Sequence, residues 1–170
     1  MSTAQFWIEK LELLKHPEGG WFKEVYRSAE TAKKETLSAD FSGDRNFSTS
    51  IYYLLEGNQF SAFHRIKSDE LWHFYTGSSG VEILWIDNGE LRKEKLGADI
   101  ENDEQFQVTV SKNKWFAARL LNKNGFALVG CTVSPGFHFE DFELADKSLP
   151  EEFPTLKDEI SELLPGVKRD

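Results

Sequence analysis

The chain has 170 residues, of which 29 are acidic and 20 basic, so its formal net charge at pH 7 is −9. This negative surplus repels phosphate backbones and anionic membranes, which argues against nucleic acid and membrane surfaces as partners. Hydrophobic residues make up 39% of the chain and aromatic residues 14%. That content suits one folded domain over residues 1–170.

The sequence also bears on the compartment. Its one cysteine, Cys131, lies in the apolar run "FALVGCTV", where a buried core thiol is expected. The opening residues lack the pattern of a signal peptide, and no apolar run approaches the length of about 20 residues that spans a bilayer. We therefore expect a cytoplasmic protein.

The first elements follow from periodicity. Ser2 and Thr3 are candidate caps for an amphipathic N-terminal helix, whose apolar residues recur at helical spacing: Phe6, Trp7, Leu11 and Leu14. The segment "HPEGG", residues 16–20, ends this helix. Alternation in "GWFKEVYRS", residues 20–28, predicts a strand, and the polar residues 29–46 predict a loop or a short ribbon.

From Ser48 onward the chain shows short apolar stretches separated by turn residues, over residues 48–57, 59–66, 70–77, 81–90, 105–111, 115–121 and 125–137. Asn88-Gly89 is the strongest hairpin signal among them. Because no crossover helices intervene, we expect an antiparallel sandwich or barrel. Residues 154–164 predict a C-terminal helix that packs on its outside, with the apolar stripe Leu156, Ile160, Leu163 and Leu164.

The stretch "HRIKSDELWHFYTG", residues 64–77, concentrates polar and aromatic side chains. Side chains alternate between the faces of a strand, so His64 shares a face with Ala62 and Ile66, and Glu70 shares one with Trp72 and Phe74. If the apolar members mark the interior, His64 and Glu70 both point into it.

This arrangement resembles the first motif of the cupin superfamily, at Gly57, His64, Glu70 and Gly77. The second histidine of the motif is replaced by Ile66. The second cupin motif falls on "SKNKWF", where its signature residues are replaced by Ser111, Asn113 and Phe116. Since two of the four usual ligands are missing, we expect no metal cofactor, with a metal at His64 and Glu70 as a disfavoured alternative.

A closer resemblance covers nearly the whole chain, through "HPEGGWFKEVYRS", "STSIYYLLEG", "FSAFHRIKSDELWHFYTG" and "VSPGFHFEDFEL". These segments look like the uncharacterised cupin 5 family, domain of unknown function 985, which brings no established reaction. The resemblance implies a mostly β, antiparallel double-stranded β-helix, the cupin jelly-roll barrel, with a pocket in its mouth and a homodimeric assembly. It also implies a distant similarity to sugar-nucleotide 3,5-epimerases, which use a histidine base, an acidic partner and a tyrosine acid without metal.

These comparisons give three candidate catalytic residues. His64 would be the base, because its ordinary pKa suits proton transfer at neutral pH, and Glu70 its partner, with Asp141 as a weaker alternative. Tyr53 is a tentative acid. Tyr52 lies on the opposite face of the same strand, so one of the two tyrosines points inward. The alternative is that His64 and Glu70 form a pair without chemistry.

Candidate ligand-binding residues surround this pair. Glu18 and Arg27 would lie at the pocket rim, with Arg27 as a fork for a carboxylate or phosphate, unless "HPEGG" is a plain connector. Trp72, Phe74 or Phe139 would stack on a ligand, unless they are simply core. The remaining candidates are hydrogen-bonding or partner residues: Ser48, Thr49, Tyr52 and Asp141.

We therefore expect a protein that binds a small polar ligand, a sugar derivative or carboxylate, in the barrel. A metal-independent sugar epimerase or isomerase with His64 as base is one alternative, and a metal-dependent oxygenase or isomerase is another. A structural or interaction protein is a third class, in which exposed residues such as His73 and Tyr75 lie in the dimer interface.

Overall fold

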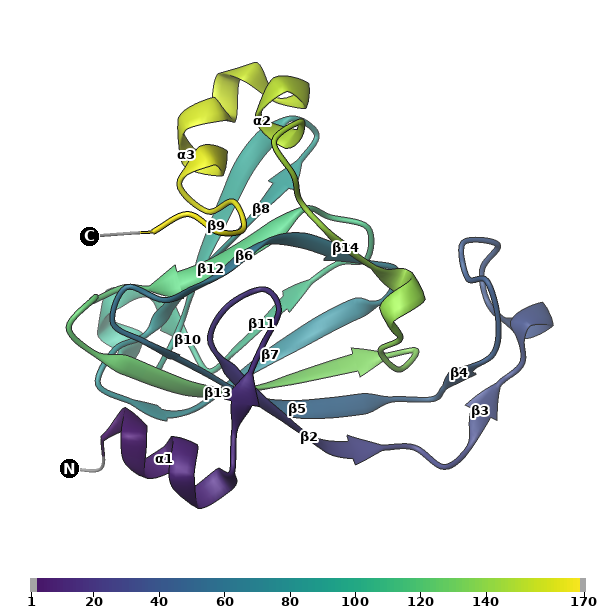
Figure 1. The fold of residues 1–170 in the computed structure, drawn as a ribbon, viewed down its shortest axis with the longest axis horizontal. Coiled ribbons are helices and arrows are strands. Elements are labelled where there is room, and N and C mark those ends of the chain that lie inside the picture. Colours follow the sequence, from purple (N-terminus) through teal and green to yellow (C-terminus); the bar gives the residue numbers. More distant parts are fainter. Residues whose placement is uncertain (1–2, 169–170) are drawn as a thin grey trace.

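The computed structural model describes residues 3–168, which form two six-stranded sheets packed face to face (Figure 1). The first sheet contains, in order, β1 (Leu14–Lys15), β2 (Trp21–Arg27), β5 (Thr49–Glu56), β13 (Phe126–Ser134), β7 (Asp69–Gly77) and β11 (Gln107–Val110). The second contains β10 (Glu104–Gln105), β9 (Glu90–Leu96), β8 (Val81–Asp87), β12 (Phe116–Leu120), β6 (Phe60–Ile66) and β14 (Phe142–Leu144). The expected jelly-roll fold is confirmed.

The strands pair antiparallel, as expected, except that β10 runs parallel to β9 over two residues. Alternation along the strands explains the core between the sheets, because every second side chain points inward. Tyr53, Trp72 and Phe116 come from three different strands and are at most 1% exposed. Their rings pack edge to face, with centroids 5.6 Å apart for Tyr53 and Trp72 and 6.5 Å apart for Trp72 and Phe116.

The N-terminal helix α1 (Ala4–Leu11) begins at Thr3, whose hydroxyl accepts a hydrogen bond from the amide of Phe6 at 3.3 Å. It covers the outer face of the first sheet, and its core-facing residues are Ala4 and Ile8. The prediction of Leu14 on this helix is wrong: Glu12 adopts a left-handed conformation that ends the helix, and Leu14 lies exposed in β1. Ser2, the other candidate cap, lies outside the described residues.

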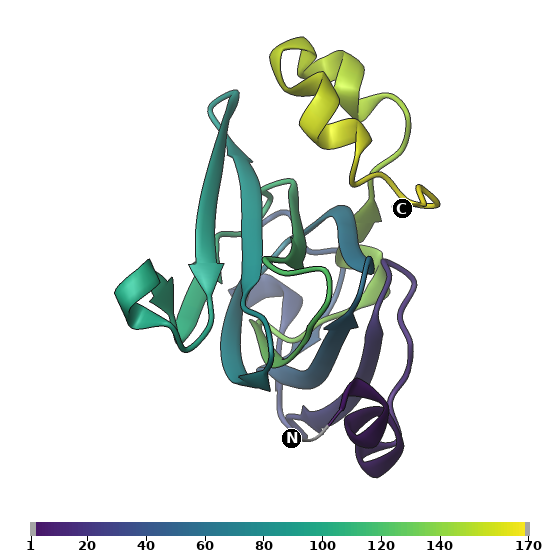
Figure 2. The same cartoon turned by 90° about the vertical axis from the view of Figure 1, so that its left-hand side faces the viewer.

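The C-terminal segment covers the outside of the second sheet, above β6 and β8 (Figure 2). The helix predicted over residues 154–164 is confirmed in part: it forms as a 3-10 turn η4 (Pro154–Leu156) followed directly by α3 (Lys157–Ser161), and a separate short helix α2 (Leu149–Glu152) precedes it. Pro154 lacks the amide hydrogen that would continue α2. The apolar stripe nevertheless serves its expected purpose, since Ile160 and Leu163 are buried against Phe63 of β6.

Two connections are turns of the expected kind. Asn88 and Gly89 both have positive φ angles, 51° and 79°, as a two-residue hairpin between β8 and β9 requires. Residues 29–46 contain a ribbon of β3 (Thr31–Ala32) and β4 (Arg45–Asn46), with a 3-10 turn η1 (Lys34–Thr36) between them. Another 3-10 turn, η2 (Ile100–Asn102), precedes β10.

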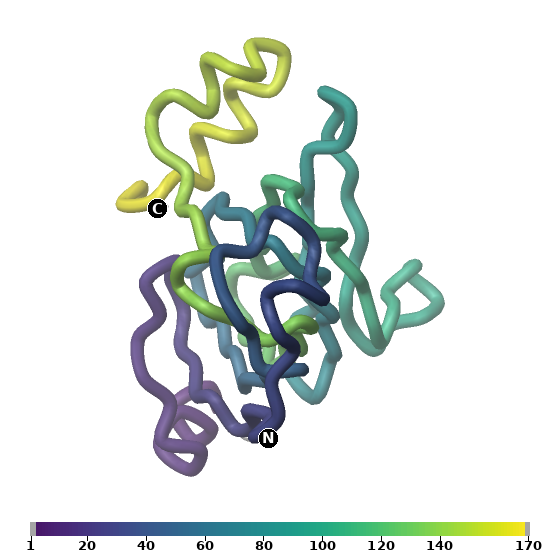
Figure 3. Tube along the Cα trace, turned by 90° about the vertical axis from the view of Figure 1, so that its right-hand side faces the viewer, coloured from purple at the N-terminus to yellow at the C-terminus, as the bar shows by residue number. Residues whose placement is uncertain are grey.

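The ribbon lies against the segment that follows β13 (Figure 3). There the 3-10 turn η3 (Phe139–Asp141) is held by a buried ion pair, in which the Arg45 guanidinium donates to both carboxylate oxygens of Asp141 at 2.5 and 2.8 Å. Each side chain is at most 4% exposed. This contact fixes η3 over one end of the barrel. Within residues 3–168, no helix is long and apolar enough to cross a membrane.

Candidate functional site

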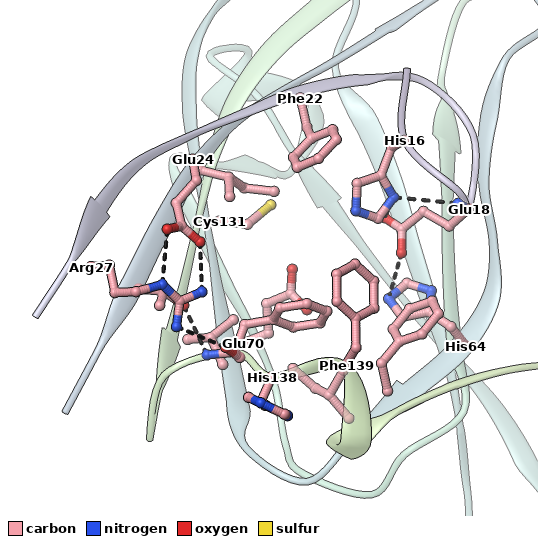
Figure 4. A pocket seen from close by; sticks show the side chains of 16 residues that line it. His16, Glu18, Phe22, Glu24, Arg27, His64, Glu70, Cys131, His138 and Phe139 are labelled. Atoms are coloured by element: carbon pink, nitrogen blue, oxygen red, sulfur yellow. Dashed lines mark hydrogen bonds and ion pairs between the residues drawn. The ribbon is translucent and has the colours of Figure 1, made fainter. Parts of the chain in front are cut away.

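A cavity of about 220 Å³ opens between the two sheets beside η3, and we call it the mouth cavity (Figure 4). Strands β2, β5, β6, β7 and β13 each contribute to its wall, and the "HPEGG" turn and η3 complete it. Part of the wall is aliphatic or aromatic, from Phe22, Ile51, Ile66 and Val133. Ionisable side chains interrupt this wall on two sides.

The "HPEGG" turn brings its acid into the cavity because it lies directly on β6. The carbonyl of Glu18 accepts a hydrogen bond from the amide of Ala62 at 2.8 Å. Gly19 has a φ of 114°, and a Cβ atom there would lie 2.1 Å from the carbonyl oxygen of Phe60. Only glycine fits this approach. The turn is therefore more than a connector, since it delivers His16 and Glu18 to the mouth cavity.

His64 has Glu18, rather than the expected Glu70, as its acidic partner. Its Nε2 lies 3.1 Å from Glu18 Oε2, and both side chains are at least nine-tenths buried. Its Nδ1 lies 2.7 Å from the carbonyl oxygen of Ala62, which can only accept, so Nδ1 carries a proton. Nε2 is then the ring atom available to Glu18.

Burial keeps this pair close to neutral. It lowers the pKa of His64 to about 4, and it raises the pKa of Glu18 despite the opposing influence of His16. The two shifts favour the uncharged forms of both groups, and Glu18 Oε2 and His64 Nε2 share one proton across their 3.1 Å contact. The Glu18–His64 pair is a buried hydrogen-bonded unit in the wall of the cavity.

His16 is the second imidazole of this wall. The amide of Glu18 donates to its Nδ1 at 3.3 Å, so the proton of the neutral ring is on Nε2. Burial lowers the pKa of His16, which favours that neutral form. Its second ring nitrogen faces the cavity in Figure 4, where it offers a hydrogen-bond donor.

Glu70 enters the cavity from β7, opposite the "HPEGG" turn. It is 7% exposed, and burial, reinforced by the negative charge of Glu18, raises its pKa to about 8. The Cys131 thiol forms a hydrogen bond with Glu70, and burial raises the pKa of that thiol. At pH 7 Glu70 is thus a neutral carboxylic acid, which both donates and accepts hydrogen bonds.

Arg27 lines the cavity, as expected, but its fork is already occupied. Its Nε and Nη2 atoms donate to the two oxygens of Glu24 at 2.9 and 2.7 Å. Its Nη1 donates to Asn46 at 2.8 Å and to the carbonyl of Phe137 at 3.2 Å. The expectation that Arg27 receives a carboxylate or phosphate is therefore not supported by its contacts.

Ile66 and Phe116 occupy the two positions at which this chain lacks a ligand of the cupin metal motifs. Phe116 pairs with His64 across β12 and β6, and their ring centroids are 4.0 Å apart. Ile66 lines the cavity. Neither side chain offers a donor atom, and residues 3–168 contain no group of three or more His, Cys, Asp or Glu that could hold a metal ion. Without donor atoms at these two positions, the side chains of the cavity do not fit the three-ligand metal site of a cupin.

Six of the candidate residues line the mouth cavity. They are His64, Glu70, Glu18, Arg27, Thr49 and Phe139. Thr49 is already engaged, because its hydroxyl accepts a hydrogen bond from the amide of Phe137 at 2.9 Å. Phe139 is 63% exposed at the rim, where it is free to contact a ligand.

The other candidates lie elsewhere. Tyr53, expected as an acid, is buried below the cavity and donates its hydroxyl to the carbonyl of Gly19 at 2.8 Å. Tyr52 packs against Tyr75 on the outer face, and the Ser48 hydroxyl donates to the carbonyl of Val133.

Three further candidates are structural. Trp72 is fully buried in the core, and Phe74 lies toward the opposite end of the barrel, next to Gly77. Asp141, the alternative partner for His64, is bound by Arg45. None of these three residues lines the mouth cavity.

Sequence reasoning missed His16 and Glu24. His16 is in the singled-out "HPEGG" segment, but only the fold shows that it lies over the cavity. Glu24 shares a strand face with Phe22, which alternation alone reveals. Its pairing with Arg27 depends on an irregularity in β2 between Glu24 and Tyr26, which the pattern of apolar residues does not indicate.

Residues 5–145 match the protein family described as Cupin superfamily (DUF985). An uncharacterised protein of Saccharomyces cerevisiae, YML079W, is 36% identical over 150 residues, which cover 82% of this chain and 74% of the yeast protein. The crystal structure of protein SO0799 from Shewanella oneidensis has a TM-score of 0.86 at 36% identity, over 96% of this chain and 98% of that one. A hypothetical protein from Leishmania major has a TM-score of 0.85 at 31% identity, over 96% and 99%.

Proposed function

The chain belongs to the DUF985 family of the cupin superfamily, and on that premise we propose that it binds a small polar molecule in the mouth cavity. Small-molecule sites are typically concave, mostly apolar and equipped with a few convergent polar groups. The mouth cavity has this composition. A sugar derivative, with an apolar ring face and hydroxyl groups at its edge, matches it well.

The observation that carries the proposal is the burial of two carboxyl groups, Glu18 and Glu70, neither of which forms an ion pair with a lysine or arginine within residues 3–168. Their ionisable neighbours are His16, His64 and Cys131. A buried carboxyl group costs folding free energy, which both raised pKa values reflect. Side chains that weaken the fold and face a cavity are characteristic of binding and catalytic sites.

The isomerase alternative receives less support. It requires His64 as a base, but burial lowers the pKa of His64 to about 4 and its Nε2 faces Glu18. The acid expected for that chemistry, Tyr53, donates its hydroxyl to Gly19. The metal-dependent alternative lacks donors at Ile66 and Phe116, and no step of our proposal uses a metal.

A screen of small polar molecules by thermal shift, followed by crystal structures of the hits, tests the proposal. Ile51→Phe adds bulk to the cavity wall, whereas Val25→Phe adds the same kind of ring at an exposed site on β2. We expect hits that raise the melting temperature of the wild type and of Val25→Phe but not of Ile51→Phe. Equal shifts in all three proteins, or no hit at all, would contradict the proposal.

A further inference from the structure

We infer that the ligand carries no negative charge and is about the size of one six-membered ring, with an apolar face against η3 and a polar edge toward Glu18 and Glu70. This inference rests on the proposed function and specifies its ligand. It departs from the carboxylate that the sequence suggested.

The charges of the wall exclude an anion. Arg27 supplies a permanent positive charge to the lining, and Glu24 neutralises it through two hydrogen bonds while Asn46 and Phe137 engage the remaining nitrogen. A carboxylate ligand would have to displace Glu24 from Arg27. It would also lose its hydration shell beside Glu18 and Glu70, two carboxyl groups that bring no positive charge to compensate for that loss.

The polar edge of the cavity suits an uncharged partner. Glu18 Oε2 faces His64 Nε2 at 3.1 Å, and its other oxygen, Oε1, has lone pairs that can accept a hydrogen bond. The carboxyl group of Glu70 donates and accepts, and the second nitrogen of His16 donates into the cavity (Figure 4). Amide and hydroxyl groups match this mixture of donors and acceptors, because they also do both.

The opposite wall fixes the size and shape. Phe137, Phe139 and Phe142 form an aromatic cluster with ring centroids 5.1 to 6.2 Å apart, and this cluster lines the cavity. Flat or apolar ring faces stack well on such side chains. Since an apolar cavity of about 150 Å³ accommodates benzene, a volume of about 220 Å³ fits one substituted ring.

Three ligands of one shape and different charge test the inference: benzamide, benzamidine and benzoate. Binding is followed by chemical-shift changes in ¹⁵N-labelled wild-type protein at pH 7, which locate the ligand as well as measure its affinity. We expect benzamide or benzamidine to shift the amide signals of residues 16–20 and 137–142. Benzoate should bind at least roughly tenfold more weakly, because Glu24 already occupies the guanidinium of Arg27 that would receive it.

A pair of variants tests the role of Arg27. Glu24→Gln frees its fork inside the cavity, whereas Glu143→Gln removes the same charge from Arg65 on the outer surface. Both glutamates are substantially exposed, so both proteins should fold. We expect benzoate to bind Glu24→Gln more tightly than wild type, and Glu143→Gln to behave as wild type.

The outcomes separate the inference from the proposed function. Benzoate binding in the cavity as tightly as benzamide would overturn the charge argument and leave a ligand-binding site in place. If the broader screen gives hits but none of the three probes binds, then the ligand does not have the inferred size and shape of one six-membered ring. If Glu24→Gln binds benzoate no more tightly than wild type does, then the occupation of Arg27 by Glu24 is not what keeps anions out.

Discussion

At Glu70 the fold holds a carboxyl group in its neutral form at neutral pH. Burial is the main cause, and the nearby charge of Glu18 adds to it. In the unfolded chain Glu70 is exposed to water and ionised at neutral pH, so the folded state binds a proton that the unfolded state releases. This difference makes folding stability depend on pH.

The sign follows from the two pKa values. Glu70 titrates near 4.5 when unfolded and near 8 when folded, so its contribution lowers stability as pH rises between these values. His64, with a pKa lowered from 6.5 to about 4, acts oppositely: its contribution is complete above pH 6.5 and is lost as pH falls toward 4. Between pH 6.5 and 8, Glu70 therefore contributes more than His64 to the change of folding stability with pH.

We predict that Glu70→Gln removes this loss of stability between pH 6.5 and 8. For one group the slope is up to about 1.4 kcal/mol per pH unit. Glu18 also has a raised pKa and acts in the same direction, so the comparison is between wild type and variant. Urea unfolding at several pH values measures it. Parallel profiles of the two proteins would show that Glu70 is ionised in the fold.

The sequence predicted that His64 and Glu70 face one interior space, because strand alternation is a local property. It did not predict that Glu18 is the partner of His64, since 45 intervening residues separate them and the contact depends on how the "HPEGG" turn lies on β6. Nor did the sequence predict that Glu24 binds the guanidinium of Arg27. Contacts of this kind are set by tertiary packing.

Among the elements, the "HPEGG" turn has the strictest requirements. Gly19 combines a positive φ with an approach to the Phe60 carbonyl that leaves no room for a side chain. Gly89, in the hairpin between β8 and β9, shares the positive φ but has open space around it. Replacing each glycine by alanine therefore separates two costs in stability: backbone strain alone at Gly89, and strain together with steric exclusion at Gly19.

We predict that Gly19→Ala costs more stability than Gly89→Ala. The latter should cost about 1 kcal/mol from backbone strain alone. Gly19→Ala should cost roughly 2 kcal/mol or more, because the turn must also move away from β6. Chemical denaturation of both variants gives the comparison. Equal costs would mean that the turn tolerates displacement.

At this scale, alternation and turn residues predicted most strands and the Asn88–Gly89 hairpin. The errors have local causes. Leu14 continues the helical period, yet the left-handed conformation of Glu12 ends the helix before it. The C-terminal stripe has helical spacing, but α3 ends at Ser161, so Leu163 and Leu164 lie in the turn after it, packed with the rest of the stripe against the second sheet.

For the whole molecule, the family resemblance implies a homodimer, and we propose that the two copies associate through the outer face of the first sheet. Tyr75 is 49% exposed there, packs against Tyr52 and lies across Gly130, where a Cβ atom would meet its hydroxyl at 2.1 Å. Glycine at this position thus allows the tyrosine to lie flat and present a ring to a partner.

We predict that Tyr75→Glu yields monomers, because a charge in the interface loses hydration without a partner. Tyr75→Phe keeps the ring and should remain dimeric. Light scattering coupled to size exclusion distinguishes the two states. A wild-type monomer, or a dimeric Tyr75→Glu variant, would rule out this interface.

The central claim is that the mouth cavity holds a small polar molecule between the Glu18–His64 pair and Glu70 without a metal. A high-resolution crystal structure of protein purified without chelators, with elemental analysis of the same sample, tests it most directly. We expect an organic molecule hydrogen-bonded to Glu18 and Glu70, and no stoichiometric transition metal. A metal ion coordinated by His64 and Glu70 would contradict the account.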